Sequence, residues 1–320
     1  MISVALPVIK TKFFKDALES VLNQSFKDFE LIIVNNGSPE DVEGILKNYS
    51  DSRIKYIKHE KMLPIIENWN RCLSYAKGEY FVLFSDDDIY EEDFLKELNY
   101  LSQKYPEVDI FHCRVKVIDE DNKTSHYTTS CPEYETVANF IWHRLKSYRL
   151  HYAPDFMCKT AVLRNIGGFV DFPKAWGSDD ATWFLMANKN GIVASSKILC
   201  KWRQSKINLS RKGTVETKLN AVNIFKNWLQ DFIENRINVT EKEKDLLSEL
   251  KKNFNQRICV QQGIALKLGV GFKRNQYLRI LFQWIRYRKK YSLQLFPLIW
   301  ALMLVAKDSK NINTNSSYLP

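Results

Sequence analysis

Three consecutive carboxylates, Asp86, Asp87 and Asp88, are the residues in this sequence most suited to chemistry. Carboxylates this close raise one another's pKa, and a divalent cation reverses that penalty. Carboxylate oxygens suit Mg²⁺ or Mn²⁺, which proteins often hold with one or two carboxylates together with substrate phosphates. The alternative is a solvated acidic turn that caps a helix beginning near Glu91. Because the triplet directly follows the apolar run Tyr80–Phe84, we expect a metal site that takes Mn²⁺ or Mg²⁺.

A second acidic pair, Asp179 and Asp180, lies in the segment WGSDDATW. If Ser178 caps a helix, both carboxylates occupy its first turn, where the helix dipole favours negative charge. The functional alternative is a general base, a carboxylate in a cleft that takes a proton from a hydroxyl nucleophile. The flanking Trp176 and Trp183 fit a sugar-stacking platform, and packing in the core explains each of them equally well.

The elements around these residues alternate between strands and helices. We expect strands at 2–6, 29–34, 53–57 and 80–84, and helices at 13–23, 40–49, 64–76. Continuous apolar strands that alternate with helices imply a parallel sheet covered on both faces. Ligands bind beyond the carboxyl ends of such strands. Asn35 and Asn36 follow one strand and the acidic triplet follows another, so the two groups should meet in one crevice.

The second half of the chain is mixed and then helical. We expect strands near 110–118 and 156–159 and helices at 136–146, 178–190, 215–235, 240–267, 275–290 and 293–306. Thr240 and Glu243 form a capping box for one of these helices. The pattern predicts a catalytic domain over 1–212 and a basic, helical C-terminal region over 213–320.

Composition places the chain among globular proteins, with 45% hydrophobic and 26% charged residues. The net charge of +10 is uneven, because 250–307 holds twelve Lys/Arg and no Asp or Glu. The six cysteines have no paired spacing, which favours reduced thiols over a zinc site or a disulfide framework. Five histidines also lack ligand spacing and are interpreted as structural: His59, His112, His126, His143 and His151.

Five motifs follow one another along the first two-thirds of the chain. They are SVALP (3–7), LIIVNNGSPED (31–41), NWNRCLSYAKGEYFVLFSDDD (68–88), IGGF (166–169) and WGSDDATW (176–183). In this order they resemble glycosyltransferase family 2. The resemblance implies an α/β GT-A fold, a Rossmann-like mixed sheet flanked by helices, here with a C-terminal helical extension. It also implies a nucleotide-sugar donor, a divalent metal and inverting transfer.

The resemblance assigns roles to residues at the donor side. It places Leu6 and Pro7 in the first donor loop, and Asn36, beside Asn35, where the family often has an aspartate that binds the base. Arg71 lies in a segment that family members use ahead of Ala-x-Gly. The family's Asp-x-Asp motif matches Asp86–Asp88, and an alternative alignment pairs Ser85 with Asp87. Donor contacts are therefore expected from the residues Leu6, Pro7, Asn35, Asn36, Arg71, Asp86 and Asp87.

At the acceptor side the resemblance makes Asp180 the base, with Asp179 preceding it in the family's acidic pair. Acceptor contacts are expected from Trp176, Gly168 and Trp183. A histidine that some relatives use to hold the metal diphosphate is not evident after the base. Arg203 or Lys206 is the expected substitute as a phosphate contact.

The function that follows is transfer of a sugar from a UDP-, dTDP- or GDP-sugar to a hydroxyl of a saccharide or lipid-linked saccharide, in bacterial capsule or O-antigen synthesis. A nucleotidyltransferase is one alternative, but such enzymes usually carry a Gly-rich phosphate loop after the first strand, and Pro7–Thr11 contains no glycine. A non-catalytic carbohydrate-binding scaffold is another, against which both acidic clusters argue.

The C-terminal region suggests a location. Arg279, Gln283, Arg286 and Lys290 form one stripe of a helix whose other positions are largely apolar, the pattern of a membrane-surface element. We expect 273–306 to contact an anionic membrane, and a cytoplasmic protein peripheral to the inner face of the cell membrane. Docking on the catalytic domain and an oligomer contact are the alternatives. Nucleic-acid binding is not expected, because no binding motif is present and the catalytic part is not basic.

Overall fold

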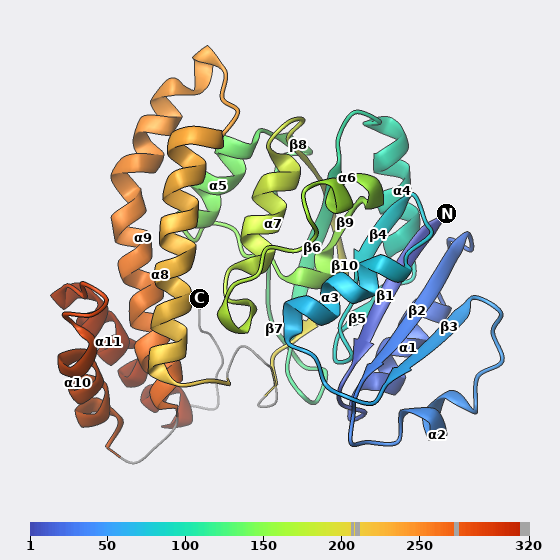
Figure 1. The fold of residues 1–320 in the computed structure, drawn as a ribbon, viewed down its shortest axis with the longest axis horizontal. Coiled ribbons are helices and arrows are strands. Elements are labelled where there is room, and N and C mark those ends of the chain that lie inside the picture. The colour runs from blue at the N-terminus through green and yellow to red at the C-terminus, as the bar shows by residue number, and fades with distance from the viewer. Residues whose placement is uncertain (206–207, 209–211, 272–274, 314–320) are drawn as a thin grey trace.

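The computed structural model describes residues 1–205, 208, 212–271 and 275–313. A central sheet is flanked by helices (Figure 1). The strands are β1 (Ile2–Val8), β2 (Phe29–Asn36), β3 (Ile54–His59), β4 (Tyr80–Leu83), β5 (Ile89–Tyr90), β6 (Ile110–Ile118), β7 (Thr124–Tyr127), β8 (Tyr134–Glu135), β9 (Phe156–Lys159) and β10 (Ile192–Arg203).

The α-helices are α1 (Phe14–Leu22), α2 (Val42–Leu46), α3 (Ile65–Tyr75), α4 (Phe94–Lys104), α5 (Val137–Leu145), α6 (Thr160–Asn165), α7 (Ser178–Ala187), α8 (Val215–Asp231), α9 (Lys244–Val270), α10 (Gln276–Tyr287) and α11 (Leu295–Asn313). Short 3₁₀ turns lie at η1 (Ala153–Asp155), η2 (Pro173–Ala175) and η5 (Glu241–Glu243), and a π-helical turn, η4 (Phe232–Arg236), extends α8.

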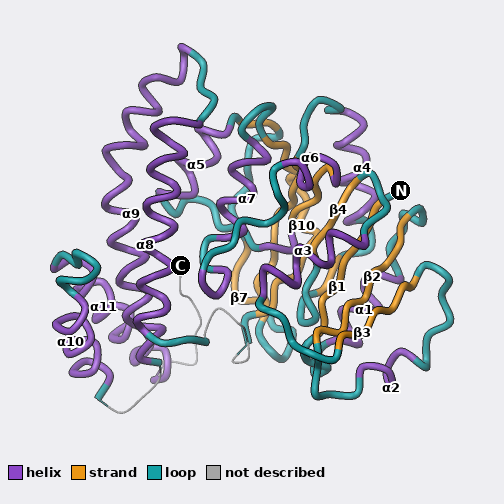
Figure 2. Tube along the Cα trace, in the orientation of Figure 1, coloured by secondary structure: helices purple, strands orange, loops and turns teal. Residues whose placement is uncertain are grey.

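The sheet is mixed, with the strand order β3-β2-β1-β4-β9-β6-β10-β5, and β7 and β8 pair with β6 and β10. Strands β1 to β4 are parallel to one another, as the alternation of strands and helices predicted. Strand β9 is antiparallel to both of its neighbours and joins this half to the parallel pair β6 and β10. Figure 2 shows the strands side by side behind α3. The prediction of a mixed α/β sheet flanked by helices is confirmed.

Both faces of the sheet are buried. In β1, Val4 and Leu6 belong to an apolar core that also contains residues of α1 and α4, whereas Ala5 belongs to a second core shared with α3, α5 and α7. This is why β1 and β2 are continuous apolar runs rather than alternating ones. The polar residues that follow them therefore mark the point where each strand leaves the core.

The C-terminal helices share the second of these cores. Leu219 of α8, Leu250 of α9 and Leu298 of α11 lie in the same apolar cluster as Ala5. Figure 1 shows α8 and α9 running side by side next to the sheet, and α10 and α11 pack on α9. The capping box of Thr240 and Glu243 is confirmed and forms η5 ahead of α9. Among the described residues, no helix is both long and apolar enough to cross a membrane.

Three predicted helix starts are corrected. Helix α2, expected over 40–49, begins at Val42 and is capped by Asp41, whose carboxylate accepts from the Gly44 N–H at 2.8 Å. Helix α4 begins at Phe94, because β5 directly follows the acidic triplet and pairs with β10. The triplet is therefore a link between two strands rather than a helix cap. Helix α7 is preceded by Gly177 at its N-cap, and the Ser178 hydroxyl accepts from the Phe172 N–H at 3.1 Å instead.

Candidate active site

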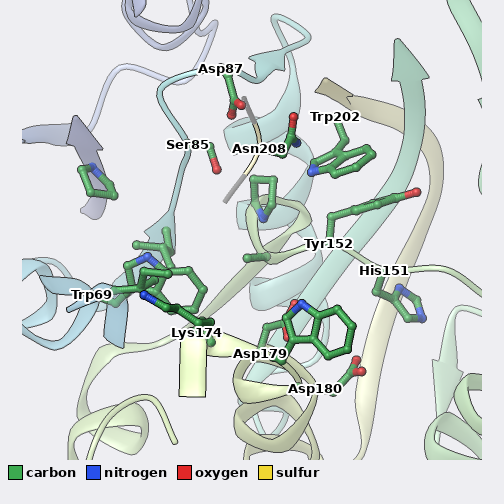
Figure 3. A pocket seen from close by; sticks show the side chains of 18 of the residues that line it. Trp69, Ser85, Asp87, His151, Tyr152, Lys174, Asp179, Asp180, Trp202 and Asn208 are labelled. Atoms are coloured by element: carbon green, nitrogen blue, oxygen red, sulfur yellow. The ribbon is translucent and has the colours of Figure 1, made fainter. Parts of the chain in front are cut away.

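The carboxyl ends of β1, β2 and β4 meet at a cavity of about 500 Å³, a volume typical of small-molecule sites. Its wall includes Pro7 near the end of β1, Asn36 at the end of β2, and Asp86 and Asp87 after β4. Asn36, Asp86 and Asp87 thus meet in one crevice as predicted, whereas Asn35 and Asp88, which were expected there too, do not line it. Figure 3 shows Ser85 and Asp87 at one end of this cavity and Asp179 and Asp180 at the other.

The Asp86 carboxylate holds the two donor-side loops together. Its Oδ2 accepts from the backbone N–H groups of Ile9 and Lys10, at 2.8 and 2.9 Å. Burial raises the pKa of Asp86, and these two hydrogen bonds oppose the rise. The loop after β1 and the loop after β4 therefore occupy fixed positions relative to each other before any ligand binds.

Asp87 is the carboxylate of the triplet best presented to the cavity. Burial, together with the neighbouring charge of Asp86, raises the pKa of Asp87 to about 7. A bound cation removes such a penalty, because it favours the ionised form. Asp87 and the adjoining Asp86 consequently fit the hard divalent cation expected from the sequence.

Asp88 lies behind the loop rather than in the cavity wall. It is 1% exposed, and its Oδ1 accepts from the Arg203 N–H at 2.7 Å. Burial and the charge of Asp87 raise the pKa of Asp88. Asp88 was expected to be a metal ligand, but its side chain does not face the cavity. The backbone turns between Asp87 and β5, and this turn directs the Asp88 side chain into the protein interior.

Arg203 braces this loop and does not face a phosphate. Its side chain is 0% exposed, and the guanidinium donates to the carbonyl of Asp87 at 2.8 Å and to that of Asp119 at 3.1 Å. The expected diphosphate contact from Arg203 is corrected accordingly, because its side chain is fully buried and does not line the cavity. Lys206, the other residue proposed for that contact, lies outside the described residues.

The two asparagines at the end of β2 have structural partners. The Asn36 amide both donates to the Leu63 carbonyl at 3.1 Å and accepts from the Leu63 N–H at 2.9 Å. Asn35 donates to Tyr56 Oη at 3.0 Å and accepts from the Ser38 N–H at 2.8 Å. Asn36 lines the cavity and Asn35 does not. Both side chains therefore hydrogen-bond mainly to neighbouring parts of the protein, which leaves few of their polar atoms for a nucleotide base.

Several other expected contacts lie outside the cavity wall. Leu6 is fully buried in the core beneath Pro7, and Arg71 extends toward Glu67, 3.8 Å away, on α3. Trp183 is 2% exposed and stacks on Phe156, so it is a core residue rather than part of a sugar-stacking platform. These side chains are held by apolar packing or by their own helix.

Gly168 serves packing rather than direct contact with the cavity. It has φ +84°, and a Cβ added there would clash with Asn70 Oδ1. Asn70 in turn accepts from the Phe169 N–H at 2.7 Å, which ties α3 to the segment ahead of α7. Asn68 and Trp69, the neighbours of Asn70, reach the cavity, as does Trp176.

The second acidic pair lies in the first turn of α7 and faces the cavity from the opposite end. Asp180 Oδ1 accepts from Arg144 Nε at 2.8 Å, and both side chains are largely buried. Burial, together with the charge of Asp180, raises the pKa of Asp179 to about 6. The pair thus combines an oriented carboxylate, Asp180, with a neighbour that titrates close to neutral pH.

Sequence patterns did not identify the residues that complete this end. Arg144 comes from α5, and Arg257 and Gln261 come from α9, a helix distant in sequence. Burial, together with the charge of Arg144, lowers the pKa of Arg257 to about 10. The only sequence signal that involved Arg257 was the basic character of 250–307, and that pattern was interpreted as a membrane-binding surface rather than as part of the active site.

One side of the cavity is aromatic. Tyr152 and Trp202 stack with ring centroids 4.2 Å apart and both line the cavity, as Figure 3 shows. His151, which the sequence suggested was merely structural, also lies in this wall. Strand β10 carries Trp202 and the segment before η1 carries Tyr152, so only the fold brings the two rings together. Such a surface can pack against the face of a sugar or a base.

Comparisons with known proteins agree with this architecture. The family model described as "Glycosyl transferase family 2" matches residues 3–167, slightly more than half of the chain. An uncharacterized glycosyltransferase of Rickettsia typhi is 22% identical over 281 residues, which cover 87% of this chain and 82% of that protein.

Two solved structures are similar in fold. Residues 1–349 of S. aureus TarS, in complex with UDP-GlcNAc, align with a TM-score of 0.64 at 16% identity, over 99% of this chain and 93% of that one. The mannosyltransferase PcManGT of Pyrobaculum calidifontis, in complex with GDP-Man and Mn²⁺, aligns with a TM-score of 0.58 at 13% identity, over 94% and 86% of the two chains. At these identities the likeness concerns the fold.

Proposed function

The chain belongs to glycosyltransferase family 2, and from this premise we propose that it transfers a sugar, with inversion, from a nucleotide diphosphate to an acceptor hydroxyl. One observation carries the proposal: a single cavity has a carboxylate suited to a metal at one end and a paired carboxylate at the other. An inverting transfer needs these two functions on opposite sides of the reacting carbon.

We place the donor at the end formed by Pro7, Asn36, Asp86 and Asp87. The complexes of the two similar structures with UDP-GlcNAc and with GDP-Man and Mn²⁺ support a nucleotide-sugar donor here, for which a UDP-, dTDP- or GDP-sugar was expected from the sequence. Asp87 and Asp86 would hold Mn²⁺ or Mg²⁺, which when bound neutralises the charge of the departing diphosphate. Lys10, whose pKa is lowered by burial, adds a cation to the same wall.

We place the acceptor near Trp176 and the acidic pair. The acceptor oxygen attacks the anomeric carbon, the bond from that carbon to the diphosphate oxygen breaks, and its electron pair leaves with the diphosphate. The hydroxyl proton passes to the carboxylate of Asp180. Arg144 orients that carboxylate by binding Oδ1, and Asp179 supplies a second negative charge at the same end.

Replacing Asp180 with Asn tests the assignment of the base. We expect transfer to fall by about 10²–10⁴-fold, the usual contribution of a general base, while donor affinity stays within about twofold. The donor itself is found by screening nucleotide sugars with Mn²⁺ for thermal stabilisation and then assaying transfer with the best one. Transfer by Asp180→Asn at the wild-type rate would exclude this residue as the base. A screen with no metal-dependent stabilisation would count against the donor assignment.

We also propose that an anionic membrane surface is a partner, so that the acceptor is a saccharide or lipid-linked saccharide of bacterial surface polysaccharide synthesis. Among the residues whose exposure the structure describes, nine of the sixteen exposed large hydrophobic side chains lie on α10 and α11, including Leu278 at 68% and Phe282 at 61% exposure. Exposed basic residues accompany them: Arg279, Arg286, Arg288, Lys289 and Lys290. Lys273 and Arg274, which the sequence included in this surface, lie outside the described residues.

Both features suit a lipid interface, where apolar side chains enter the headgroup region and each Lys or Arg adds about 1 kcal/mol near anionic lipid. The test is flotation of the full chain with phosphatidylglycerol vesicles. Leu278→Glu with Phe282→Glu should abolish flotation, whereas the matched control Tyr100→Glu, at an exposed site on α4, should retain it. Flotation of the double variant equal to that of the wild type would overturn the membrane proposal.

A further inference from the structure

A buried cluster of His112, His151 and Asp155 lies outside the two acidic groups just described. His112 is on β6, His151 precedes η1, and Asp155 ends η1. Their side chains are only 2%, 7% and 0% exposed. Asp155 Oδ2 lies 3.9 Å from His112 Nδ1 and 3.7 Å from His151 Nδ1, distances too long for hydrogen bonds.

Several polar atoms of this cluster have no hydrogen-bond partner in the described part of the chain. Within it, four buried atoms accept or donate no hydrogen bond: both ring nitrogens of His112, Nε2 of His151 and Oδ2 of Asp155. Each buried polar group left unpaired costs about 1–3 kcal/mol, and a carboxylate costs more. Because each of the three side chains carries at least one unpaired buried atom, the cluster calls for an occupant that bonds to more than one of them.

The surrounding packing fixes the orientation of the three side chains. The His112 ring stacks on Phe156 with centroids 5.2 Å apart, and the His151 ring meets it edge-on at 4.8 Å. Asp155 Oδ1 accepts from the Tyr152 N–H at 2.8 Å, so its other oxygen is turned toward the rings. The site is therefore held in place by the fold around it.

Two neutral imidazoles and one carboxylate form a donor set that suits a transition metal such as Zn²⁺. Tetrahedral ligands about 2.0–2.1 Å from Zn²⁺ lie about 3.4 Å from one another. The distances from Asp155 Oδ2 to the Nδ1 atoms of His112 and His151, 3.9 and 3.7 Å, exceed this by about half an ångström or less.

Nearby charges do not prevent a cation from binding. Arg149 hydrogen-bonds to Glu135, and Arg144 hydrogen-bonds to Asp180, so both guanidinium groups are compensated. A second set of potential ligands, which shares His112 and adds Cys131 and Glu135, is less suitable because Arg149 occupies the Glu135 carboxylate. His151 lines the cavity and provides a route of entry for the ion.

We propose that His112, His151 and Asp155 form a second divalent-metal site, selective for Zn²⁺, separate from the acidic loop. The ion anchors η1 to β6. It thereby holds the cavity wall made by Tyr152, Ala153 and Pro154. Its role is to position that wall, and it takes no part in the transfer step.

The test measures Zn²⁺ bound per chain, by elemental analysis, and its affinity, by competition with a chromophoric chelator, in the full-length protein. We expect about one Zn²⁺ per chain in the wild type and in Asp87→Asn, which disables the acidic loop. Asp155→Asn keeps the shape of the side chain and should weaken Zn²⁺ binding at least tenfold. The matched control His126→Gln, at a partly buried histidine on β7, should bind as the wild type does.

Zinc X-ray absorption of the Asp87→Asn protein needs no change in the cluster and should show scattering from two imidazoles. Three results would overturn the proposal: no bound Zn²⁺ in the wild type, zinc without imidazole ligands, or equal affinity in Asp155→Asn. The first of these would leave ordered water as the occupant. None depends on sugar transfer, so failure here is distinguishable from failure of the proposed function.

Discussion

Replacing Arg144 with Gln removes the charge that holds the proposed base. Arg144 Nε lies 2.8 Å from Asp180 Oδ1, and the two side chains are 16% and 14% exposed. Unit charges about 4 Å apart attract by about 4 kcal/mol at an effective dielectric constant of about 20. Breaking a buried pair from one side costs about 3–5 kcal/mol. Because water reaches part of this pair, we expect Arg144→Gln to lower the free energy of unfolding by about 2–3 kcal/mol.

The same substitution should move the pH dependence of transfer. Arg144 lowers the pKa of Asp179, which burial and the charge of Asp180 bring to about 6. Without the guanidinium the pKa of Asp179 rises, so its ionised form is lost at a higher pH. We expect the acidic limb of kcat/KM to shift from near pH 6 upward by about one unit, while donor affinity is unchanged. Arg144→Lys keeps the positive charge but loses the planar guanidinium. The acidic limb of its pH profile should lie between those of the wild type and Arg144→Gln.

The measurements are urea unfolding at pH 7.5 and transfer rates across about pH 5–9. The matched control is Arg236→Gln, whose ion pair with Asp231 has a similar N–O distance of 2.9 Å but 39% and 53% exposure, and which should cost less than about 1 kcal/mol. An Arg144→Gln protein as stable as this control, with an unshifted acidic limb, would refute the assignment of Arg144 as the positioning residue.

Three further predictions concern the donor end and the core. Asp87→Asn should abolish metal-dependent binding of the donor, and in the wild type the Mn²⁺ affinity, followed by electron paramagnetic resonance, should weaken about tenfold from pH 8 to 6, because a proton competes for a carboxyl with a pKa of about 7. Unchanged affinity across this range would contradict that role. Arg203→Met should lower both the melting temperature and the metal affinity, because the acidic loop loses the guanidinium that hydrogen-bonds to the Asp87 carbonyl. A lower melting temperature with unchanged metal affinity would show that Arg203 does not position the metal-binding carboxylates. Gly168→Ala, whose Cβ would meet Asn70, should cost about 2–4 kcal/mol in urea unfolding, and Gly167→Ala, which has open space around it, about 1 kcal/mol. Equal costs would show that the contact with Asn70 is unimportant.

The pH dependence of stability has a definite sign for the acidic pair. The pKa of Asp179 in the folded state, about 6, lies above that of an unfolded aspartate, about 3.9. The folded protein therefore binds the extra proton, and its contribution to stability decreases as pH rises from about 4 to about 6. The cost of burying the ionised Asp179 beside Asp180 is the physical reason why these two carboxylates need the positive charge of Arg144. It also makes the acceptor end of the cavity an electrostatically unfavourable part of the fold.

Sequence periodicity determined the parallel half of the sheet, because strands buried on both faces must be continuous apolar runs. The same reasoning located the acidic groups, since polar residues that end such strands lie at one edge of the sheet. It could not resolve which carboxylate of the triplet faces the cavity. That depends on how the backbone turns between β4 and β5, and on Arg203, which comes from β10, more than a hundred residues later.

Tertiary structure alone decided the rest of the site. Arg144 and Arg257 reach Asp180 and its cavity from α5 and α9, and His112 meets His151 and Asp155 across 39 residues of chain or more. No local spacing encodes such contacts, because a sequence motif records neighbours along the chain and these residues are neighbours only through packing. The order of residues thus determined the kind of protein and the ends of its strands, and the folding of distant elements onto one another decided which charges are paired, which are buried and which face a substrate.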